Sequence, residues 1–241
     1  MAVESFQNRV DALTGFGSTD NNALADWLND GAREIINVLP ASLIVKCAKE
    51  TYITSPEGLD DFDTRGAILG VTRYDDTRYQ PCREIPGSYR GRANDSGDLV
   101  HYGTSSDPVF WKWNNTLGVY PEPSSGNPVA IQHVSYPVFD TTGADLNIDV
   151  DNDSDNTIAN FPDEVEHLVV LYAAIKAAES LLASEEDDDL YVPIINTLKA
   201  DYTSGLNMLG IGAQSPAKPA GQQKQQKQMQ DLFQQMLERQ Q

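Results

Sequence analysis

Residues 161–184, with the sequence FPDEVEHLVVLYAAIKAAESLLAS, form the stretch that decides the fold. Pro162 suits the first position of a helix, because the N–H that it lacks would have no intrahelical partner there. Asp163 and Glu164 follow and place negative charge at the positive end of the helix dipole. The sequence therefore predicts a helix over residues 162–184.

Two apolar stripes run along this predicted helix at three- and four-residue steps. The first stripe contains Val165, Leu168, Val169, Tyr172, Ile175 and Leu182. The second contains Leu171, Ala174, Ala178 and Leu181. A helix that is apolar around most of its circumference is buried on more than one side. Two interpretations remain open: a central core helix of one domain, or a helix whose second stripe is a subunit interface covered by another copy of the chain.

The composition limits the classes of function. The chain has 241 residues, enough for one large domain or two small ones. Its 17 basic and 36 acidic residues give a net charge of −19. This balance argues against general affinity for nucleic acid or anionic membranes, because phosphate binding requires clustered Lys and Arg. It still permits contact with DNA that slides past without binding.

Targeting signals are lacking in the sequence. The first residues, MAVESFQNRVDALTG, do not have the basic start and apolar run of a signal peptide. We find no apolar stretch that reaches the roughly 20 residues of a membrane span. Cys47 and Cys82 form no CxxC pair and are expected to be free thiols in a reducing compartment. We therefore expect a soluble chain made in a cytoplasm, with no membrane partner.

The remaining elements follow from changes in periodicity. Helices are predicted over residues 4–13 and 22–39, with Ser18, Thr19 and Asp20 as N-cap candidates for the second. Short β-type runs follow at residues 51–54, 67–74 and 79–85. A hairpin is predicted over residues 109–136, turning at Asn114-Asn115, with residues 129–136 as its return strand. Residues 87–103 are predicted to be an exposed loop, and a last long helix is predicted over residues 190–209.

These elements predict an α+β fold. The expected architecture is a helical bundle, made of the N-terminal helices and a C-terminal antiparallel helix hairpin, with a central antiparallel β insertion and a C-terminal docking helix. The expected segments are residues 1–46 (N-terminal helices of the bundle), 47–140 (β-rich insertion), 141–160 (acidic loop), 161–212 (helical hairpin), 213–221 (linker) and 222–241 (docking helix). The docking helix is predicted because apolar residues recur at helical spacing in a Gln-rich segment, namely Met229, Leu232, Phe233, Met236 and Leu237.

No catalytic or metal motif is evident in the sequence. Asp149, Asp151, Asp153 and Asp155 alternate like calcium ligands, but the Gly and Glu that an EF-hand loop requires are missing. The three histidines have no metal-site spacing, and there is no GxSxG, Walker or GxGxxG motif. We therefore expect no cofactor and no enzymatic activity. Six arginines in the β region favour either scattered solvated side chains or a patch for an acidic partner: Arg65, Arg73, Arg78, Arg83, Arg90 and Arg92.

Two features together carry a family resemblance. The first is the segment LGVYPEP at residues 117–123, followed by the strand VAIQHVSYP at residues 129–137. The second is FPDE at residues 161–164, which opens an Ala-rich helix followed by an acidic turn and a last long helix. This arrangement resembles the head-to-tail connector (adaptor) proteins of tailed bacteriophages.

The resemblance implies a virion structural protein at the neck of the particle, synthesised in the host cytoplasm. Such connectors form rings that dock beneath the portal. The resemblance therefore implies three kinds of partner: further copies of the chain in a dodecamer, the portal protein above, and a tail or nozzle protein below. A C-terminal extension often docks on the portal, which suits residues 222–241.

The acidic composition fits a DNA channel, because negative charge repels phosphates and lets a duplex pass without specific binding. The expected acidic channel or surface residues are Glu185, Glu186, Asp187, Asp188 and Asp189. The alternatives are another neck, tail or baseplate ring component, a β-barrel hydrolase, or a receptor-binding module suggested by Trp111 and Trp113.

Overall fold

The computed structural model describes residues 4–15, 20–60, 62, 66–114, 116–144, 147–184 and 188–210. Within them the fold is a mixture of helices and several β-sheets, as expected for the α+β class. The predicted linker 213–221 and docking helix 222–241 lie outside the described residues.

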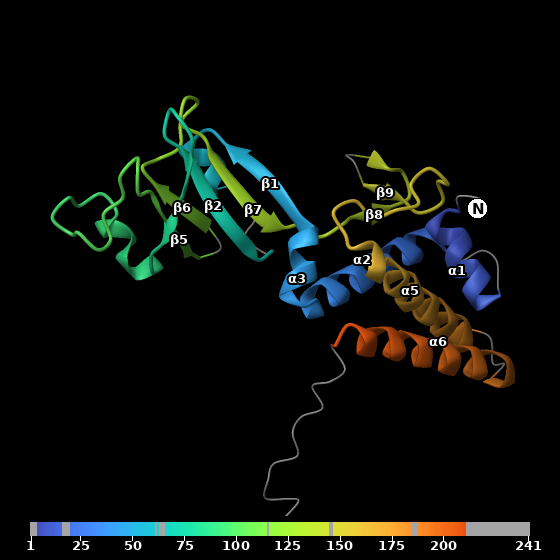
Figure 1. Cartoon of the computed structure of the whole chain (residues 1–241). Helices are drawn as coiled ribbons and strands as arrows, with labels where there is room; N and C mark the ends of the chain where they lie inside the picture. The colour runs from blue at the N-terminus through green and yellow to red at the C-terminus, as the bar shows by residue number, and fades with distance from the viewer. Residues whose placement is uncertain are drawn as a thin grey trace, which may run out of the picture.

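Four long helices make up a helical body (Figure 1). These are α1 (Phe6–Thr14), α2 (Asn21–Val38), α5 (Asp163–Ser184) and α6 (Asp188–Met208). The central one is α5, which packs against α1, α2 and α6. We use the name helical body for residues 4–47 and 137–210.

Local capping explains where the N-terminal helices begin and end. Ser5 caps α1, since its side chain accepts a hydrogen bond from the backbone N–H of Asn8. Gly15 ends α1 in the left-handed conformation, with φ of 75°. Asp20 caps α2 by accepting from the N–H of Asn22, which confirms it among the three predicted N-cap candidates. The predicted helices therefore agree with α1 and α2 to within two residues.

The core of the body lies around α5. Leu168 and Val165 have no exposed surface, and neither do Leu24, Leu28 and Ile35 of α2 or Phe6 and Val10 of α1. Small residues let the helices approach closely: a Cβ on Gly31 of α2 would lie 2.9 Å from the Tyr172 ring of α5. By length and hydropathy, α5 resembles a membrane span, but half of its most apolar stretch is buried inside the fold. This burial is typical of the core helix of a globular protein.

A second lobe, residues 48–136, contains most of the strands. One sheet has the order β1-β7-β2-β3, with all pairs antiparallel. A second sheet has the order β4-β5-β6, in which β4 and β5 are parallel. We call this part the β lobe. Its strands are β1 (Ala48–Ile53), β2 (Ile68–Tyr74), β3 (Tyr79–Pro81), β4 (Arg83–Glu84), β5 (Val109–Trp113), β6 (Thr116–Tyr120) and β7 (Val129–Val134).

Four short helical segments complete the described part of the chain. Two connect α2 to the first strand, and two lie within the β lobe. They are α3 (Ala41–Ile44), η1 (Val45–Cys47), α4 (Pro56–Asp60) and η2 (Gly87–Arg92). None of the four was predicted, because segments this short carry too little periodicity to be recognised.

The pairing of the predicted hairpin needs a correction. Strands β5 and β6 do form an antiparallel hairpin, with Asn114 at positive φ in the turn. The predicted return strand, however, does not pair with β6: β7 lies between β1 and β2 in the other sheet. The physical reason is that Val129, Ala130 and Ile131 are all buried, so β7 is stabilised as a central strand with partners on both sides.

A small apolar core fills the β lobe. Ile131 and Val129 of β7 pack with Leu117 and Val119 of β6 and with Val71 of β2. These residues come from both sheets, so the two sheets share one core. The lobe therefore has a core of its own that is separate from the core around α5.

The predicted acidic excursion at residues 141–160 is partly a core element. Two short parallel strands, β8 (Phe139–Asp140) and β9 (Ile148–Asp149), pair at its start. Val150 and Ile158 lie in the apolar cluster of the helical body, and the N–H of Gln7 donates to the Val150 carbonyl at 2.9 Å. The segment has a polar surface, as predicted, but two of its apolar residues anchor it to the helical body.

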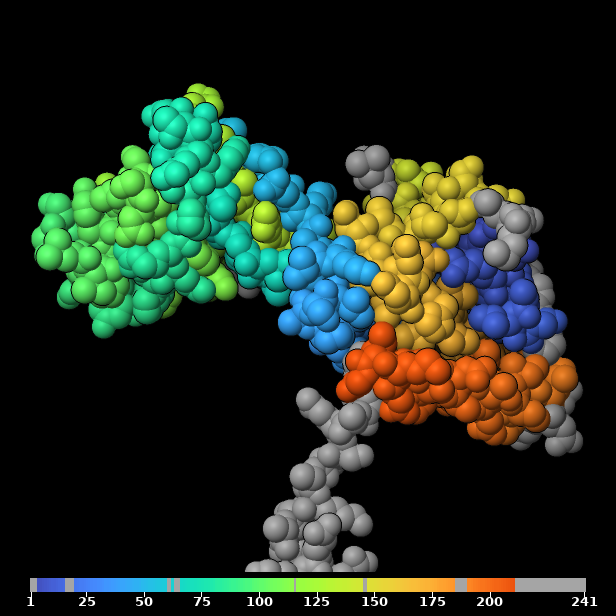
Figure 2. Space-filling view, viewed as in Figure 1, coloured from blue at the N-terminus to red at the C-terminus, as the bar shows by residue number. Residues whose placement is uncertain are grey.

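The two lobes meet at a waist, visible in the space-filling view (Figure 2). The chain enters the β lobe after η1 and leaves it after β7, and there the N–H of Ser135 donates to the carbonyl of Cys47 at 3.0 Å. The Tyr136 hydroxyl, beside the waist, donates to Asn37 of α2 at 3.0 Å. A cavity of about 520 Å³ lies at this junction; it is lined by Arg33, Asn37, Gly66, His133, Val134, Ser135, Tyr136 and Val138.

Candidate functional site

The predicted subunit-interface stripe is covered by the chain itself. Ala174 and Ala178 have no exposed surface, and Leu171 is 9% exposed. Ala178 packs with Tyr191 and Ile195 of α6, and Leu181 is partly buried against the same cluster. Leu171, Ala174 and Ala178 therefore offer almost no surface to a second copy, because they are covered by residues of their own chain. Any contact between copies must use other residues.

The other predicted site residues fall largely outside the described part of the chain. Met229, Leu232, Phe233, Met236 and Leu237 are not described, and neither are Glu185, Glu186 and Asp187. Asp188 and Asp189 form the start of α6, but their side chains are not described. The docking role and the acidic channel role of these residues remain predictions.

Charge is distributed very unevenly between the lobes. The sequence of the helical body contains five basic and 22 acidic residues, a net charge of −17. The β lobe contains eight basic and 12 acidic residues, a net charge of −4. All five cations of the body are already paired with a carboxylate, at N–O distances from 2.5 to 3.9 Å. The body therefore carries a large surplus of carboxylates that its own cations cannot neutralise.

Some of these carboxylates have a structural role. In the acidic run 149–155, Asp153 accepts a hydrogen bond from the backbone N–H of Ser5 at 3.0 Å. Asp151 accepts one from the side-chain amide of Asn21 at 3.2 Å. The run is thus tied to the beginnings of α1 and α2. Within the described ranges, no group of three His, Cys, Asp or Glu residues has the arrangement of a metal site.

The arginines of the β lobe do not form one patch. Arg73 is 5% exposed, and its guanidinium donates to the carbonyls of Pro121, Tyr74 and Glu122. Its charge is therefore used to fix the loop after β6. Arg65 lies outside the described residues. The sequence left two alternatives open for the six arginines, scattered solvated side chains or one patch for an acidic partner. Because Arg73 is buried, a single patch made of all six arginines is excluded.

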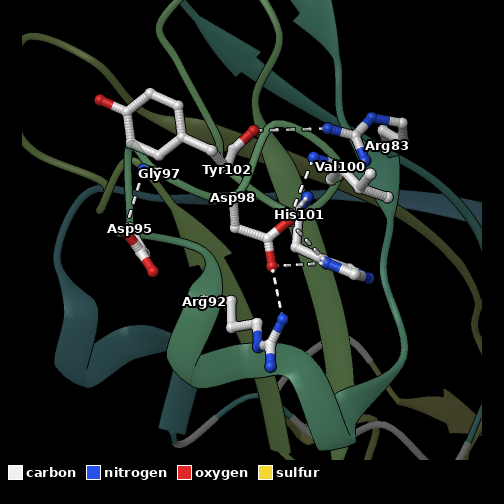
Figure 3. A network of polar contacts seen from close by, with 8 residues as sticks. All are labelled: Arg83, Arg92, Asp95, Gly97, Asp98, Val100, His101 and Tyr102. Carbon is white, nitrogen blue, oxygen red and sulfur yellow. Dashed lines mark hydrogen bonds and ion pairs between the residues drawn. The ribbon is translucent and has the colours of Figure 1, made fainter.

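The segment predicted as a plain exposed loop, residues 87–103, is organised around Asp98. Its carboxylate accepts hydrogen bonds from the His101 ring at 3.0 Å and from the Arg92 guanidinium at 3.1 Å (Figure 3). It also accepts from the backbone N–H of Val100 and of His101. The hydrogen bond from His101, together with that from Arg92, holds the pKa of Asp98 well below its usual value, against the opposing effect of desolvation.

A second set of contacts fixes the same loop from the other side. Arg83 donates to the carbonyl of Val100 at 2.6 Å and to the carbonyl of Tyr102 at 3.4 Å. The Tyr89 ring of η2 stacks on the His101 ring with centroids 4.3 Å apart. Two aliphatic side chains are nevertheless left in solvent, since Leu99 is 90% exposed and Val100 is 66% exposed.

We call Tyr89, Arg90, Arg92 and residues 98–101 the β-lobe tip. A signal for it exists in the sequence, because an Asp that is followed two and three residues later by free backbone N–H groups is typical of an Asx-turn. The pattern DLVH at residues 98–101 has this spacing. It was missed because the surrounding Gly, Arg and Asp residues resemble an unstructured loop.

No catalytic arrangement is evident in the described part of the chain. Desolvation raises the pKa of Cys47 to about 11 and of Cys82 to about 12, so both thiols are neutral near pH 7. A neutral thiol is a poor nucleophile. His133 lines the cavities at the waist and beside β1, and its ring lies 3.0 Å from the hydroxyl of Thr51. None of the described residues that line these two cavities is a Cys or a Lys.

Comparison with known proteins identifies the family. The family model of the SU10 adaptor protein matches residues 1–239. The chain therefore belongs to the SU10 adaptor protein family. No curated protein matches the sequence.

Family membership confirms the resemblance drawn from the hairpin and the α5 helix. The chain is a structural adaptor protein of a phage and thus a component of the virion. Its family is not a family of enzymes, and an adaptor interacts with other proteins of the phage head or tail.

Proposed function

We propose that this chain forms a ring that docks beneath the portal, joins the capsid to the tail and surrounds the DNA on its way out of the head. The observation that carries the proposal is the charge of the helical body, −17 by sequence, with every cation of the body already paired. Membership of an adaptor family supports it.

The charge suits a channel wall for a physical reason. A protein that binds DNA releases counterions by neutralising phosphates with Lys and Arg. The body has no unpaired cation among its described residues with which to do so. Its carboxylates repel the phosphates instead, so a duplex passes without binding. The acidic residues Glu185 to Asp189 are proposed to face this channel or the solvent.

The partners in this proposal are further copies of the chain, in a number that matches a dodecameric portal, the portal protein above and a tail or nozzle protein below. Residues 222–241 are proposed to dock on the portal. Met229, Leu232, Phe233 and Met236 have the i, i+3, i+4, i+7 spacing of a helix laid in a groove. Residues 211–241 carry four basic and two acidic residues, so this segment differs in charge from the acidic body.

The test is reconstitution of the neck from purified components. We expect the full-length chain, mixed with the portal ring of the same phage, to form a co-axial complex in electron micrographs. A variant truncated after Gly212 is expected to lose this attachment while its circular dichroism remains that of the full-length chain. Double-stranded DNA at physiological salt is expected to show no tight binding to the full-length chain or to the complex.

Three outcomes would contradict the proposal. Attachment of the truncated chain to the portal as tightly as the full-length chain would exclude the docking role of residues 222–241. Tight DNA binding would exclude a passive channel. A ring that attaches to tail proteins but never to the portal would instead identify another neck, tail or baseplate component.

A further inference from the structure

The β-lobe tip presents exposed apolar side chains on a fixed backbone. Leu99 is 90% exposed and Val100 is 66% exposed, the two most exposed residues of the β lobe among the large hydrophobic side chains described. A single exposed aliphatic residue is ordinary in a folded protein. Two adjacent exposed aliphatic residues on a turn that is held by Asp98 and Arg83 are unusual. Because the turn is already ordered, binding through it costs less conformational entropy than binding through a flexible loop.

Cations lie beside these apolar side chains. The Arg92 side chain is 60% exposed while it pairs with Asp98, whose side chain is only 12% exposed. Arg90 lies over the Trp113 ring at 4.4 Å and donates to the Gly87 carbonyl, and none of the described carboxylates forms an ion pair with it. Arg, Trp and Tyr are the residues that most often dominate binding energy at protein interfaces.

Two carboxylates offset the positive charge of these arginines. Asp95 is exposed and accepts a hydrogen bond from the N–H of Gly97, and the charge of Asp98 is satisfied by Arg92 and His101. The tip itself has Arg90 and Arg92 against Asp98, and with the neighbouring Asp95 the charges in this region balance. It can therefore approach an acidic surface without net repulsion, and its arginines gain favourable contacts there.

In a ring of identical chains, the acidic surface next to each tip is the helical body of another copy. Two bodies side by side would bring charges of −17 and −17 together, which is unfavourable. A β lobe against a body reduces this repulsion, because the β lobe carries −4 where a second body would carry −17. The body also offers aliphatic side chains that are not fully covered, since Leu190 and Val192 near the start of α6 are 46% and 39% exposed.

The tip and the start of α6 lie at opposite ends of the molecule (Figure 1). A contact between them in successive copies is therefore head-to-tail, and head-to-tail contacts close into rings when the rotation between copies allows it. We propose that the β-lobe tip of one copy docks on the acidic helical body of the next, with Leu99 and Val100 as the apolar anchor and Arg90 and Arg92 as the electrostatic contacts. The inference rests on the proposed ring and names the surface that builds it.

The first experiment measures assembly of the full-length chain by light scattering over a range of concentrations. We expect Leu99→Asp combined with Val100→Asp to raise the concentration needed for half-assembly by about tenfold or more, since loss of an interface anchor weakens binding by at least that factor. Leu69→Asp is the matched control, because Leu69 is 38% exposed but lies in β2, outside both the β-lobe tip and the helical body. It is expected to assemble like the wild-type chain.

The second experiment identifies what the tip touches. The photo-crosslinker p-benzoylphenylalanine replaces Leu99, and the variant is mixed with isotope-labelled wild-type chain before irradiation. We expect crosslinks between copies to peptides from residues 4–47 or 137–210. Crosslinks to the β lobe of the other copy would overturn the head-to-tail contact.

The outcomes separate this inference from the proposed function. If the wild-type chain forms a ring and the Leu99 and Val100 variant forms it at the same concentration, the ring stands and the role of the tip is wrong. If the wild-type chain forms no ring, alone or with the portal, both the ring and the role of the tip are wrong.

Discussion

The helical body and the β lobe are stabilised by different means. The body has one extensive apolar core in which residues of α1, α2 and α5 have no exposed surface. The β lobe has smaller apolar clusters, and its loops are fixed by charged side chains that donate to or accept from the backbone, as Arg73 and Asp98 do. The difference indicates that burial dominates the stability of the body, whereas particular side-chain contacts determine the shape of the β lobe.

The largest effect is expected from opening the core of the body. Leu168→Ala removes a side chain with no exposed surface at the centre of α5. Such substitutions lower the free energy of unfolding by about 2–5 kcal/mol, because the transfer energy is lost and a cavity is left. Denaturant titration followed by circular dichroism measures the change. Leu13→Ala, on the exposed side of α1, is the control and should change stability little; equal losses for the two variants would contradict the assignment of the core.

A smaller loss is expected from crowding in the β lobe. A Cβ on Gly118 would lie 2.2 Å from the Trp111 ring, which is too close for any real contact. Gly118→Ala must displace Trp111 from its place on β5, and overpacking of this kind costs about 1–3 kcal/mol. The near-ultraviolet circular dichroism of the tryptophans should change with it. Gly126→Ala is the matched control, since nothing lies within 4 Å of the added methyl group. A wild-type spectrum and wild-type stability for Gly118→Ala would contradict the close packing of Trp111 on Gly118.

The third effect is expected to be local. Asp98→Asn weakens the hydrogen bonds that hold residues 98–101 but removes no apolar contact, so the thermal midpoint should change little. Limited proteolysis should cut this loop faster than in the wild-type chain. Asp95→Asn is the control, because Asp95 accepts only one described hydrogen bond, from Gly97.

The pH dependence of this loop follows from the same contacts. The pKa of Asp98 is lowered in the folded protein, mainly by the His101 hydrogen bond. The contribution of a carboxylate with a lowered pKa is complete above the unfolded value of about 3.9 and is lost as the pH falls through the folded value. Protection of the loop from pepsin should therefore persist at pH 4. Cleavage that begins above pH 5 would contradict a carboxylate held by these contacts.

The smallest effect is expected at the two thiols. Burial raises the pKa of Cys47 to about 11 and of Cys82 to about 12. The stability that comes from burying a neutral thiol is complete below the unfolded pKa of about 8.5 and is lost as the pH rises through the folded value. At pH 8 both should react slowly with a disulfide reagent until denaturant is added. Cys82 should react before Cys47, since Cys47 has no exposed surface whereas Cys82 is half-buried.

Local structure was predictable where the residues that cause it are neighbours in sequence. The apolar stripes of α2 and α5, the cap at Asp20 and the turn at Asn114 are all encoded within a few residues, and all four agree with the structure. The charge difference between the lobes was also available from the sequence, although its significance depended on knowing which cations are paired.

Long-range pairing was not predictable in the same way. The alternation of β7 shows that it is a strand, but nothing within residues 129–134 specifies β1 and β2 as its neighbours instead of β6. Likewise, the second stripe of α5 needed a partner, and the sequence did not distinguish α6 of the same chain from another copy. The partner is determined by tertiary packing, which a single sequence pattern does not contain.

The waist has a consequence for how the chain folds and varies. Cys47 and Ser135 are joined by a backbone hydrogen bond, so the β lobe is an insertion whose two ends meet. The entropic cost of closing such a loop rises by only about 0.6 kcal/mol for each doubling of its length. The helical body is therefore nearly indifferent to the size of what is inserted between these two residues. Lengthening, shortening or replacing the β lobe of this chain should accordingly leave the body folded.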